Sequence, residues 1–283
     1  MSDHGSRKDG TVSADGGGIV SGTTPVVEQV RSADGTPIAF ERSGAGPAVI
    51  LVGGAFSDRH ATRDLGAALA ADFTVLGYDR RGRGHSGDTA PYEIGREIDD
   101  LAALIATAGG SAAVYGISSG AILAALATAQ GLPVTGLVLF EPPFQVGSHV
   151  GIRKDITAQL IELIAADDRD GAVAAFLSAS VGLPAEAIAG MKTQPMWGGL
   201  TAIAHTLVYD SIVTAGGRLP DRLAAITAPT LAVDSTGSPQ WLRDGSRAAA
   251  EAIPGGRAIS LDGGYHDVPP ATLAPALREF LLG

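Results

Sequence analysis

The chain has 283 residues, of which 45% are hydrophobic and 18% are charged, a composition typical of a globular protein. Its net charge of −10 at pH 7 argues against binding to nucleic acid or to an anionic membrane surface. It has no cysteine, which excludes disulfides, thiol catalysis and thiolate metal sites. No apolar run has the length of a membrane span, and the N-terminus lacks the apolar stretch of a signal peptide, so we expect a cytoplasmic protein.

The first segment, residues 1–24, is polar and glycine-rich and has no apolar periodicity, so it is predicted to be a disordered leader. Its run Gly16-Gly17-Gly18 is not a nucleotide-binding loop, because such a loop needs a strand before it and a helix after it.

From residue 25 onward, short apolar runs alternate with helical patterns. One helical face is marked by Ile94, Ile98, Leu101 and Ile105. Alternation of this kind predicts an α/β fold, a mostly parallel eight-stranded sheet with helices on both faces. The predicted strands are residues 26–31, 37–42, 48–52, 73–78, 112–115, 134–140, 230–233 and 258–261.

One interval breaks the alternation, because residues 144–219 contain helical spacing and no strand pattern. This interval is interpreted as a helical cap inserted after strand 6, and residues 25–143 and 220–283 then form the core. Gly54 and, from the cap, Phe144, Met196 and Trp197 are predicted to line a substrate pocket. Further apolar candidates in the cap are Phe176, Leu177, Met191 and Leu200.

The most informative motif is Gly116-Ile117-Ser118-Ser119-Gly120, which follows an apolar run and precedes an alanine-rich helical pattern. Small residues around Ser118 allow the strained strand-to-helix turn of a nucleophile elbow. The following helix points its free N–H groups back at this turn and favours negative charge there. Ser118 is therefore the candidate nucleophile, against the alternative of an ordinary glycine-rich loop.

A serine hydroxyl needs a base, and the chain has six histidines. His266 follows the last predicted strand and precedes the final helix, which predicts that it lies at the same sheet edge as Ser118. It is the candidate general base, with a structural loop histidine as the alternative.

An oxyanion formed at Ser118 needs two N–H donors. The Ser119 amide is one candidate. Ala55 is the other, in the glycine-rich turn after the strand that ends at Val52, with Gly54 or Phe56 as alternatives if the register differs by one residue.

Together these motifs resemble the α/β-hydrolase family, from about Val26 to the C-terminus. The segment from Asp79 to Gly87, DRRGRGHSG, is similar to a segment of that family that follows the fourth strand. The resemblance implies that its arginines shape a loop near the pocket and do not form a phosphate site.

The triad acid departs from the commonest family pattern. The resemblance puts Ser238 where most relatives have an aspartate, and a serine cannot supply the charge that stabilises an imidazolium. Glu141 stands just past strand 6, from which its side chain can reach the same histidine. Asp234 is the alternative acid, and a missing or unrecognised acid is the third alternative. Zearalenone lactone hydrolases and many haloalkane dehalogenases use a glutamate at the Glu141 position, and the elbow sequence with Glu-Pro after strand 6 looks most like the lactone hydrolases. Ser118 stands where dehalogenases carry a carboxylate, which disfavours dehalogenation.

These observations predict a serine hydrolase that acts on a small, mainly apolar ester or lactone and needs no metal or cofactor. The expected partner is a small-molecule substrate, without nucleic acid or membrane, and a homodimer is left open. The same triad is compatible with C–C bond hydrolysis, thioester cleavage or perhydrolysis. A non-catalytic small-molecule receptor on the same fold is the alternative from a different class.

Overall fold

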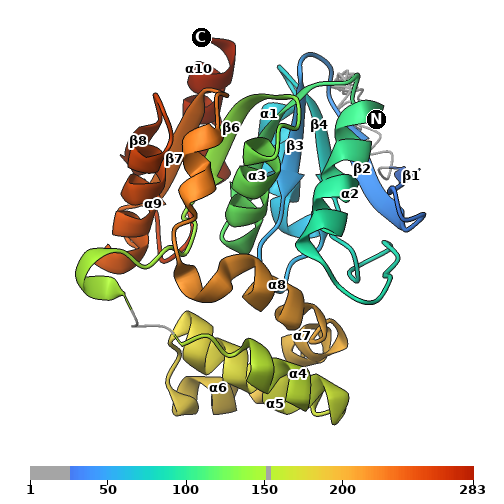
Figure 1. Ribbon diagram of the computed structural model, residues 1–283, viewed down its shortest axis with the longest axis vertical. Coiled ribbons are helices and arrows are strands. Elements are labelled where there is room, and N and C mark those ends of the chain that lie inside the picture. The colour runs from blue at the N-terminus through green and yellow to red at the C-terminus, as the bar shows by residue number, and fades with distance from the viewer. Residues whose placement is uncertain (1–25, 151–153) are drawn as a thin grey trace, which may run out of the picture.

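The computed structural model describes residues 26–150 and 154–283. The predicted disordered leader, residues 1–24, lies outside the described residues. Figure 1 shows two parts of the molecule, a sheet with helices on both faces and a group of helices below one end of the sheet. Within the described ranges, no helix is both long enough and apolar enough to cross a bilayer.

An eight-stranded sheet forms the core, and its strand order is β1-β2-β4-β3-β5-β6-β7-β8. The pairs β1/β2 and β2/β4 are antiparallel, and the remaining neighbours are parallel. The predicted mostly parallel eight-stranded sheet is confirmed. The strands are β1 Val27–Arg31, β2 Pro37–Ser43, β3 Ala48–Val52, β4 Thr74–Tyr78, β5 Ala112–Ile117, β6 Val134–Phe140, β7 Thr230–Ser235 and β8 Arg257–Leu261.

Helices cover both faces of the sheet, and each face has its own apolar core. One core unites the sheet with α2, α3 and α9, and the other unites it with α1 and α10. Helix α3 is buried along nearly its whole length, because its alanines and glycine let it pack closely against β5 and β6. The core helices are α1 Arg63–Leu69, α2 Ile94–Thr107, α3 Ser119–Ala129, α9 Gln240–Ala252 and α10 Pro270–Leu282, with the short helices η1 Arg59–Thr62 and η5 Asp221–Ala225.

The helical cap lies between β6 and β7 in the chain, as predicted. Helices α4 to α7 form the lower group in Figure 1, and α8 lies between this group and the sheet. The bounds are η2 Gly147–His149, α4 Thr157–Ala165, α5 Arg169–Phe176, η3 Leu177–Val181, α6 Ala185–Lys192, α7 Met196–Ala202, α8 Thr206–Thr214 and η4 Ala215–Gly217.

The parallel register brings the carboxyl ends of four strands to one edge. Val52 of β3 pairs with Gly116 of β5, and Phe140 of β6 pairs with Ile117 of β5 and Val233 of β7. The loops that leave β3, β5, β6 and β7 therefore meet at this edge, where ligands bind in open α/β sheets.

Candidate active site

Ser118 lies at the sharp turn between β5 and α3. Its backbone has φ 57° and ψ −123°, a conformation that is strained for a residue with a side chain. A Cβ on Gly116 would lie 2.4 Å from the Gly120 carbonyl oxygen, and a Cβ on Gly120 would lie 2.5 Å from the Val52 and Gly53 carbonyl oxygens. Glycine at both positions is therefore a steric requirement of this turn, which has the geometry of a nucleophile elbow.

Glu141 binds His266 from the end of the neighbouring strand. Its Oε2 lies 2.6 Å from His266 Nδ1, and its Oε1 accepts a 2.8 Å hydrogen bond from the Ser235 backbone N–H. The Glu141 side chain is fully buried, so its charge acts on the imidazole with little screening by water. The bond at Nδ1 leaves Nε2 as the ring nitrogen for a second partner. Phe140 stacks on the imidazole with ring centroids 5.8 Å apart.

Asp234, the alternative acid, faces away from His266. It is buried and accepts a 2.9 Å hydrogen bond from Arg243 Nε on α9. Side chains alternate along a strand, and the next residue, Ser235, points to the His266 loop and donates to the Gly264 carbonyl. The interpretation of Asp234 as the acid is therefore wrong, because its carboxylate is paired with Arg243 on the other side of β7.

Ser238 does lie beside His266, at the position where the resemblance places the usual aspartate. Its hydroxyl accepts a 2.9 Å hydrogen bond from the backbone N–H of His266 and thereby fixes the loop that carries the imidazole. The loop after β7 thus contacts the main chain of His266, and the residue after β6 contacts its ring.

The turn after β3 packs directly on Ser118. A Cβ on Gly54 would lie 3.1 Å from the Ser118 Cβ and 3.1 Å from the Ile117 carbonyl oxygen, so a larger residue at this position would have to displace the elbow by a few tenths of an ångström. Ser57 Oγ donates to the Gly54 carbonyl at 2.6 Å, and Phe56, with φ 59°, packs edge-on against Phe176 of the cap at 5.4 Å. The cap therefore holds the turn that contains the predicted oxyanion donor Ala55.

Strained backbone is concentrated at this edge of the sheet. In the described part of the chain, four of the six non-glycine residues with positive φ are Phe56, Ser118, Glu141 and His266. Such conformations persist where the surrounding structure enforces them, and they cluster at functional sites.

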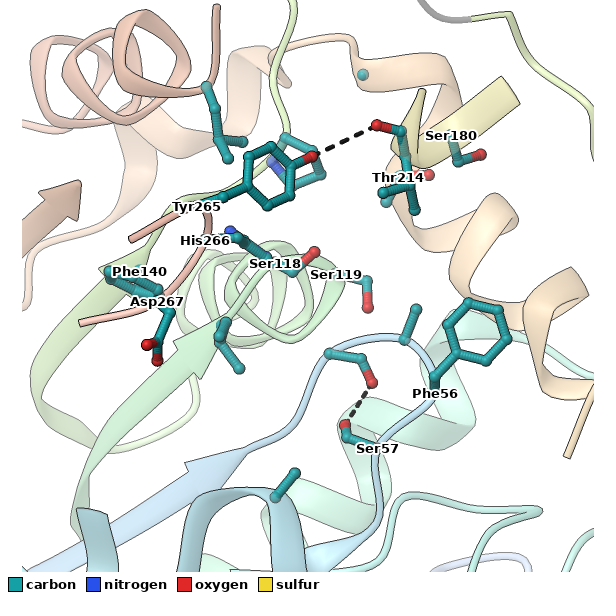
Figure 2. A pocket seen from close by; sticks show the side chains of 18 of the residues that line it. Phe56, Ser57, Ser118, Ser119, Phe140, Ser180, Thr214, Tyr265, His266 and Asp267 are labelled. Atoms are coloured by element: carbon teal, nitrogen blue, oxygen red, sulfur yellow. Dashed lines mark hydrogen bonds between the residues drawn. The ribbon is translucent and has the colours of Figure 1, made fainter. Parts of the chain in front are cut away.

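A cavity of about 480 Å³ opens between the sheet edge and the cap. Ser118 and His266 both line it on its core side, and Phe56 and Ser180 lie toward the cap in Figure 2. Tyr265 reaches across from the His266 loop, and its hydroxyl donates to the Val181 carbonyl of the cap at 3.4 Å. The lining includes the predicted Gly54, Ala55, Ser118, Ser119 and His266.

Three predicted pocket residues do not line this cavity. Phe144 is fully buried in the core beside α3 and α9, because the chain turns inward after β6. Trp197 packs in the cap core and its indole N–H donates to Asp170 at 2.7 Å, and Met196 is exposed. The prediction for these three residues is therefore wrong. Phe176, from the wider set of cap candidates, does line the cavity.

The arginines of the Asp79–Gly87 segment are buried and paired with carboxylates, which confirms their predicted structural role. Arg81 pairs with Asp100 at 2.7 Å, and Arg80 pairs with Glu97 at 2.7 Å. None of the acids that pair with these arginines was predicted from the sequence, and among them Asp210 on α8 binds Arg80, Arg83 and Ser119. The sequence feature that indicates Asp210 is a carboxylate within the otherwise mainly apolar stretch of α8, where a buried charge needs a partner.

In residues 26–150 and 154–283, no group of three or more histidine and carboxylate side chains is arranged to hold a metal ion.

Known proteins resemble this chain over most of its length. An alpha/beta hydrolase from Sphaerobacter thermophilus is 49% identical, with a TM-score of 0.84, over 89% of this chain and 99% of that one. A hydrolase from Pseudomonas aeruginosa has 24% identity and a TM-score of 0.70, and the match covers 91% of this chain and 98% of the hydrolase chain. The esterase RhEst1 from a Rhodococcus species has 21% identity and a TM-score of 0.64, and the match covers 91% of this chain and 98% of the esterase chain.

No curated protein matches the chain significantly. Residues 49–276 match the model of the alpha/beta hydrolase family. Together with the observed fold and the 49% identical structure, this match shows that the chain belongs to the alpha/beta hydrolase family.

Proposed function

We propose that this protein is a serine hydrolase that cleaves a small, mainly apolar carboxylic ester or lactone through an acyl-enzyme intermediate. The observation that carries the proposal is the 2.6 Å hydrogen bond between buried Glu141 and His266, at a cavity that Ser118 also lines. A carboxylate, an imidazole and a serine in this order can activate the hydroxyl as a nucleophile.

In the first half of the reaction, Ser118 Oγ attacks the carbonyl carbon while His266 Nε2 takes the hydroxyl proton. The Glu141 carboxylate holds the imidazole in the tautomer with its proton on Nδ1 and stabilises the imidazolium. The backbone N–H groups of Ala55 and Ser119 donate to the oxyanion, and Ser119 is favoured because it opens α3, where N–H groups have no partner within the helix. The bond to the leaving oxygen then breaks, and that oxygen receives the proton from His266.

In the second half, His266 Nε2 takes a proton from water, and the resulting hydroxide attacks the acyl carbon. The bond to Ser118 Oγ breaks, and His266 returns the proton to Oγ. An ester yields an alcohol and a carboxylic acid, and a lactone yields one hydroxy acid. No other reactant is needed.

The cavity supports a small and largely apolar substrate. Its volume of about 480 Å³ is in the range of small-molecule sites, and its walls include Phe56, Phe176, Val181 and Leu273. A lactone remains a candidate because the elbow sequence and the glutamate after β6 resemble the zearalenone lactone hydrolases. One solved structure of the same fold, at 21% identity, is an enol-lactonase from Burkholderia xenovorans.

The cap, residues 144–219, is proposed to be the substrate-binding domain over a catalytic core formed by residues 25–143 and 220–283. The support for this division is that Phe176, Ser180 and Val181 of the cap line the same cavity as Ser118 and His266.

The test is labelling with a fluorophosphonate, followed by peptide mapping of the adduct. We expect the adduct on Ser118 in the wild type and in Ser180→Ala, which removes a cavity serine of the cap. Ser118→Ala should lose the label and on the order of a millionfold in turnover while it retains the fold. A label on another residue, or near-normal turnover in Ser118→Ala, would refute the covalent mechanism.

A panel of aryl esters, lactones and thioesters then defines the substrate class. Turnover of thioesters alone would assign the same triad to other acyl chemistry. A wild type that neither reacts with the fluorophosphonate nor turns over any member of the panel would favour the non-catalytic receptor.

A further inference from the structure

Four buried charged side chains lie next to the elbow. Arg80 binds Glu97 in a two-point ion pair at 2.8 and 2.7 Å, and it binds Asp210 at 2.8 Å. Arg83 binds the other oxygen of Asp210 at 2.7 Å. Two guanidinium groups thus neutralise two carboxylates, and all four side chains are almost fully buried. Breaking one of these ion pairs would leave a buried charge without a partner, which is strongly destabilising.

This cluster contacts both sides of the proposed oxyanion hole. On one side, Arg83 Nη1 donates to the Gly54 carbonyl at 2.5 Å and to the Ser57 carbonyl at 3.2 Å. On the other side, Ser119 Oγ donates to Asp210 Oδ1 at 2.7 Å. Asp210 therefore links the two backbone segments whose N–H groups must converge on the oxyanion. It binds Ser119 directly, and it reaches the turn that contains Ala55 through Arg83.

We propose that Asp210 is a positioning residue for the proposed hydrolysis, one that fixes the distance between the Ala55 and Ser119 amides and so keeps the oxyanion hole assembled. The inference rests on the proposed function. The inference extends that function, because Asp210 does not line the cavity and acts only through the residues that it binds.

The position of Asp210 makes the cap part of the catalytic geometry. Helix α8 contacts α4 and α5 of the cap and α2 and α3 of the core. Although burial alone would raise the pKa of Asp210, the Arg83 and Arg80 guanidiniums hold it below the ordinary aspartate value. Asp210 is therefore charged at neutral pH, and its bonds to the hole are charge-assisted.

The test is Asp210→Asn, which keeps the shape and removes the charge. With an aryl acetate as substrate, kcat should fall by about tenfold to a hundredfold, because a small displacement of donors weakens transition-state stabilisation. KM should stay within about threefold of the wild type. The inhibition constant of an aryl trifluoromethyl ketone, whose adduct with Ser118 carries an oxyanion, should rise by the same factor as kcat falls.

Asp100→Asn is the matched control. Asp100 is likewise a buried aspartate paired with arginine, here in a two-point ion pair with Arg81. Among the described residues, its hydrogen bonds reach neither Ser119 nor the turn from Gly53 to Ser57. We expect a similar loss of thermal stability in both variants and a change in kcat in Asp210→Asn alone. Equal loss of kcat in both, or a rise in KM alone in Asp210→Asn, overturns the inference.

If Asp210→Asn does not fold, Ser119→Ala tests the positioning role of Asp210 instead. It keeps the backbone amide and all the ion pairs and removes the hydroxyl that donates to Asp210 and that accepts a 3.3 Å hydrogen bond from Arg80. A lower kcat and a weaker trifluoromethyl ketone complex support the inference, and wild-type values overturn it. The proposed function fails separately, if the wild type neither reacts with a fluorophosphonate nor hydrolyses any ester or lactone.

Discussion

Glu141 Oε2 lies 2.6 Å from His266 Nδ1, although the two residues are 125 positions apart in the chain. The glutamate extends from the end of β6, and the loop after β7, where most relatives carry the acid, supplies Ser238 as a hydrogen-bond acceptor for the His266 backbone. The negative charge beside the imidazole therefore comes from the strand next to the elbow strand.

Exchange of each carboxylate for its amide tests which acid supports the histidine. Glu141→Gln removes the charge beside His266 and can impose the wrong tautomer, so turnover should fall by roughly a hundredfold to ten-thousandfold. Asp234→Asn is the control, because its partner is Arg243 and not His266, and it should cost far less turnover. Steady-state kinetics with an aryl ester gives both values, and a larger loss in Asp234→Asn would contradict the assignment of Glu141.

A second experiment asks whether an acid after β7 can replace Glu141. Ser238→Asp in the Glu141→Gln background puts a carboxylate where Ser238 Oγ lies 2.9 Å from the His266 backbone nitrogen. We expect turnover to recover in part relative to Glu141→Gln, because a carboxylate at this position can reorient toward Nδ1. Ser238→Asn in the same background is the control for shape, and equal recovery with Asn would show that charge is not the cause.

Acid should destabilise the protein through its ion pairs. Burial alone would raise the pKa of Asp34, but hydrogen bonds from Thr36 and the Arg81 guanidinium lower it to about 2. Arginine neighbours likewise lower the pKa values of Glu97 and Asp210.

These lowered values fix the sign of the pH dependence. The unfolded chain binds protons at higher pH than the folded one, so the stabilisation is complete above the ordinary aspartate value of 3.8 and is lost as pH falls toward about 2. Urea unfolding between these limits should show a falling midpoint. Asp34→Asn should make this fall shallower, and an unchanged slope would contradict the role of Asp34.

Tyr265 should restrict the size of the substrate. It reaches across the cavity toward the cap, and half of its surface is exposed. Tyr265→Ala should raise kcat/KM for a bulky aryl ester relative to an acetate by about tenfold, since the opening widens. Tyr265→Phe keeps the ring and loses only the hydroxyl bond to Val181, so it should keep the wild-type preference. An unchanged preference in Tyr265→Ala would show that the ring does not limit access.

The sequence by itself determined the sheet, its helical layers and the place of the nucleophile motif. Strands buried on both faces are continuous apolar runs, and the order of runs and helical patterns defines a mostly parallel sheet, so these features depend on residues close together in the chain. The observed strands agree with the predicted ranges to within two residues at each end. The elbow motif at Ser118 is local in the same way, because neighbouring glycines permit its turn.

Only the tertiary structure decided which carboxylate meets His266 and which side chains form the cavity. Asp234 and Glu141 both come directly after an apolar run in the sequence. The structure distinguishes them, because side chains alternate along β7 and turn Asp234 toward Arg243, whereas Glu141 at the end of β6 reaches His266. The direction of the chain after β6 buried Phe144 in the core. Asp210 binds partners 91 to 130 positions away. A buried charge in an apolar helix indicates that a partner exists, but local periodicity carries no information about distant partners, which are set by the way the layers pack.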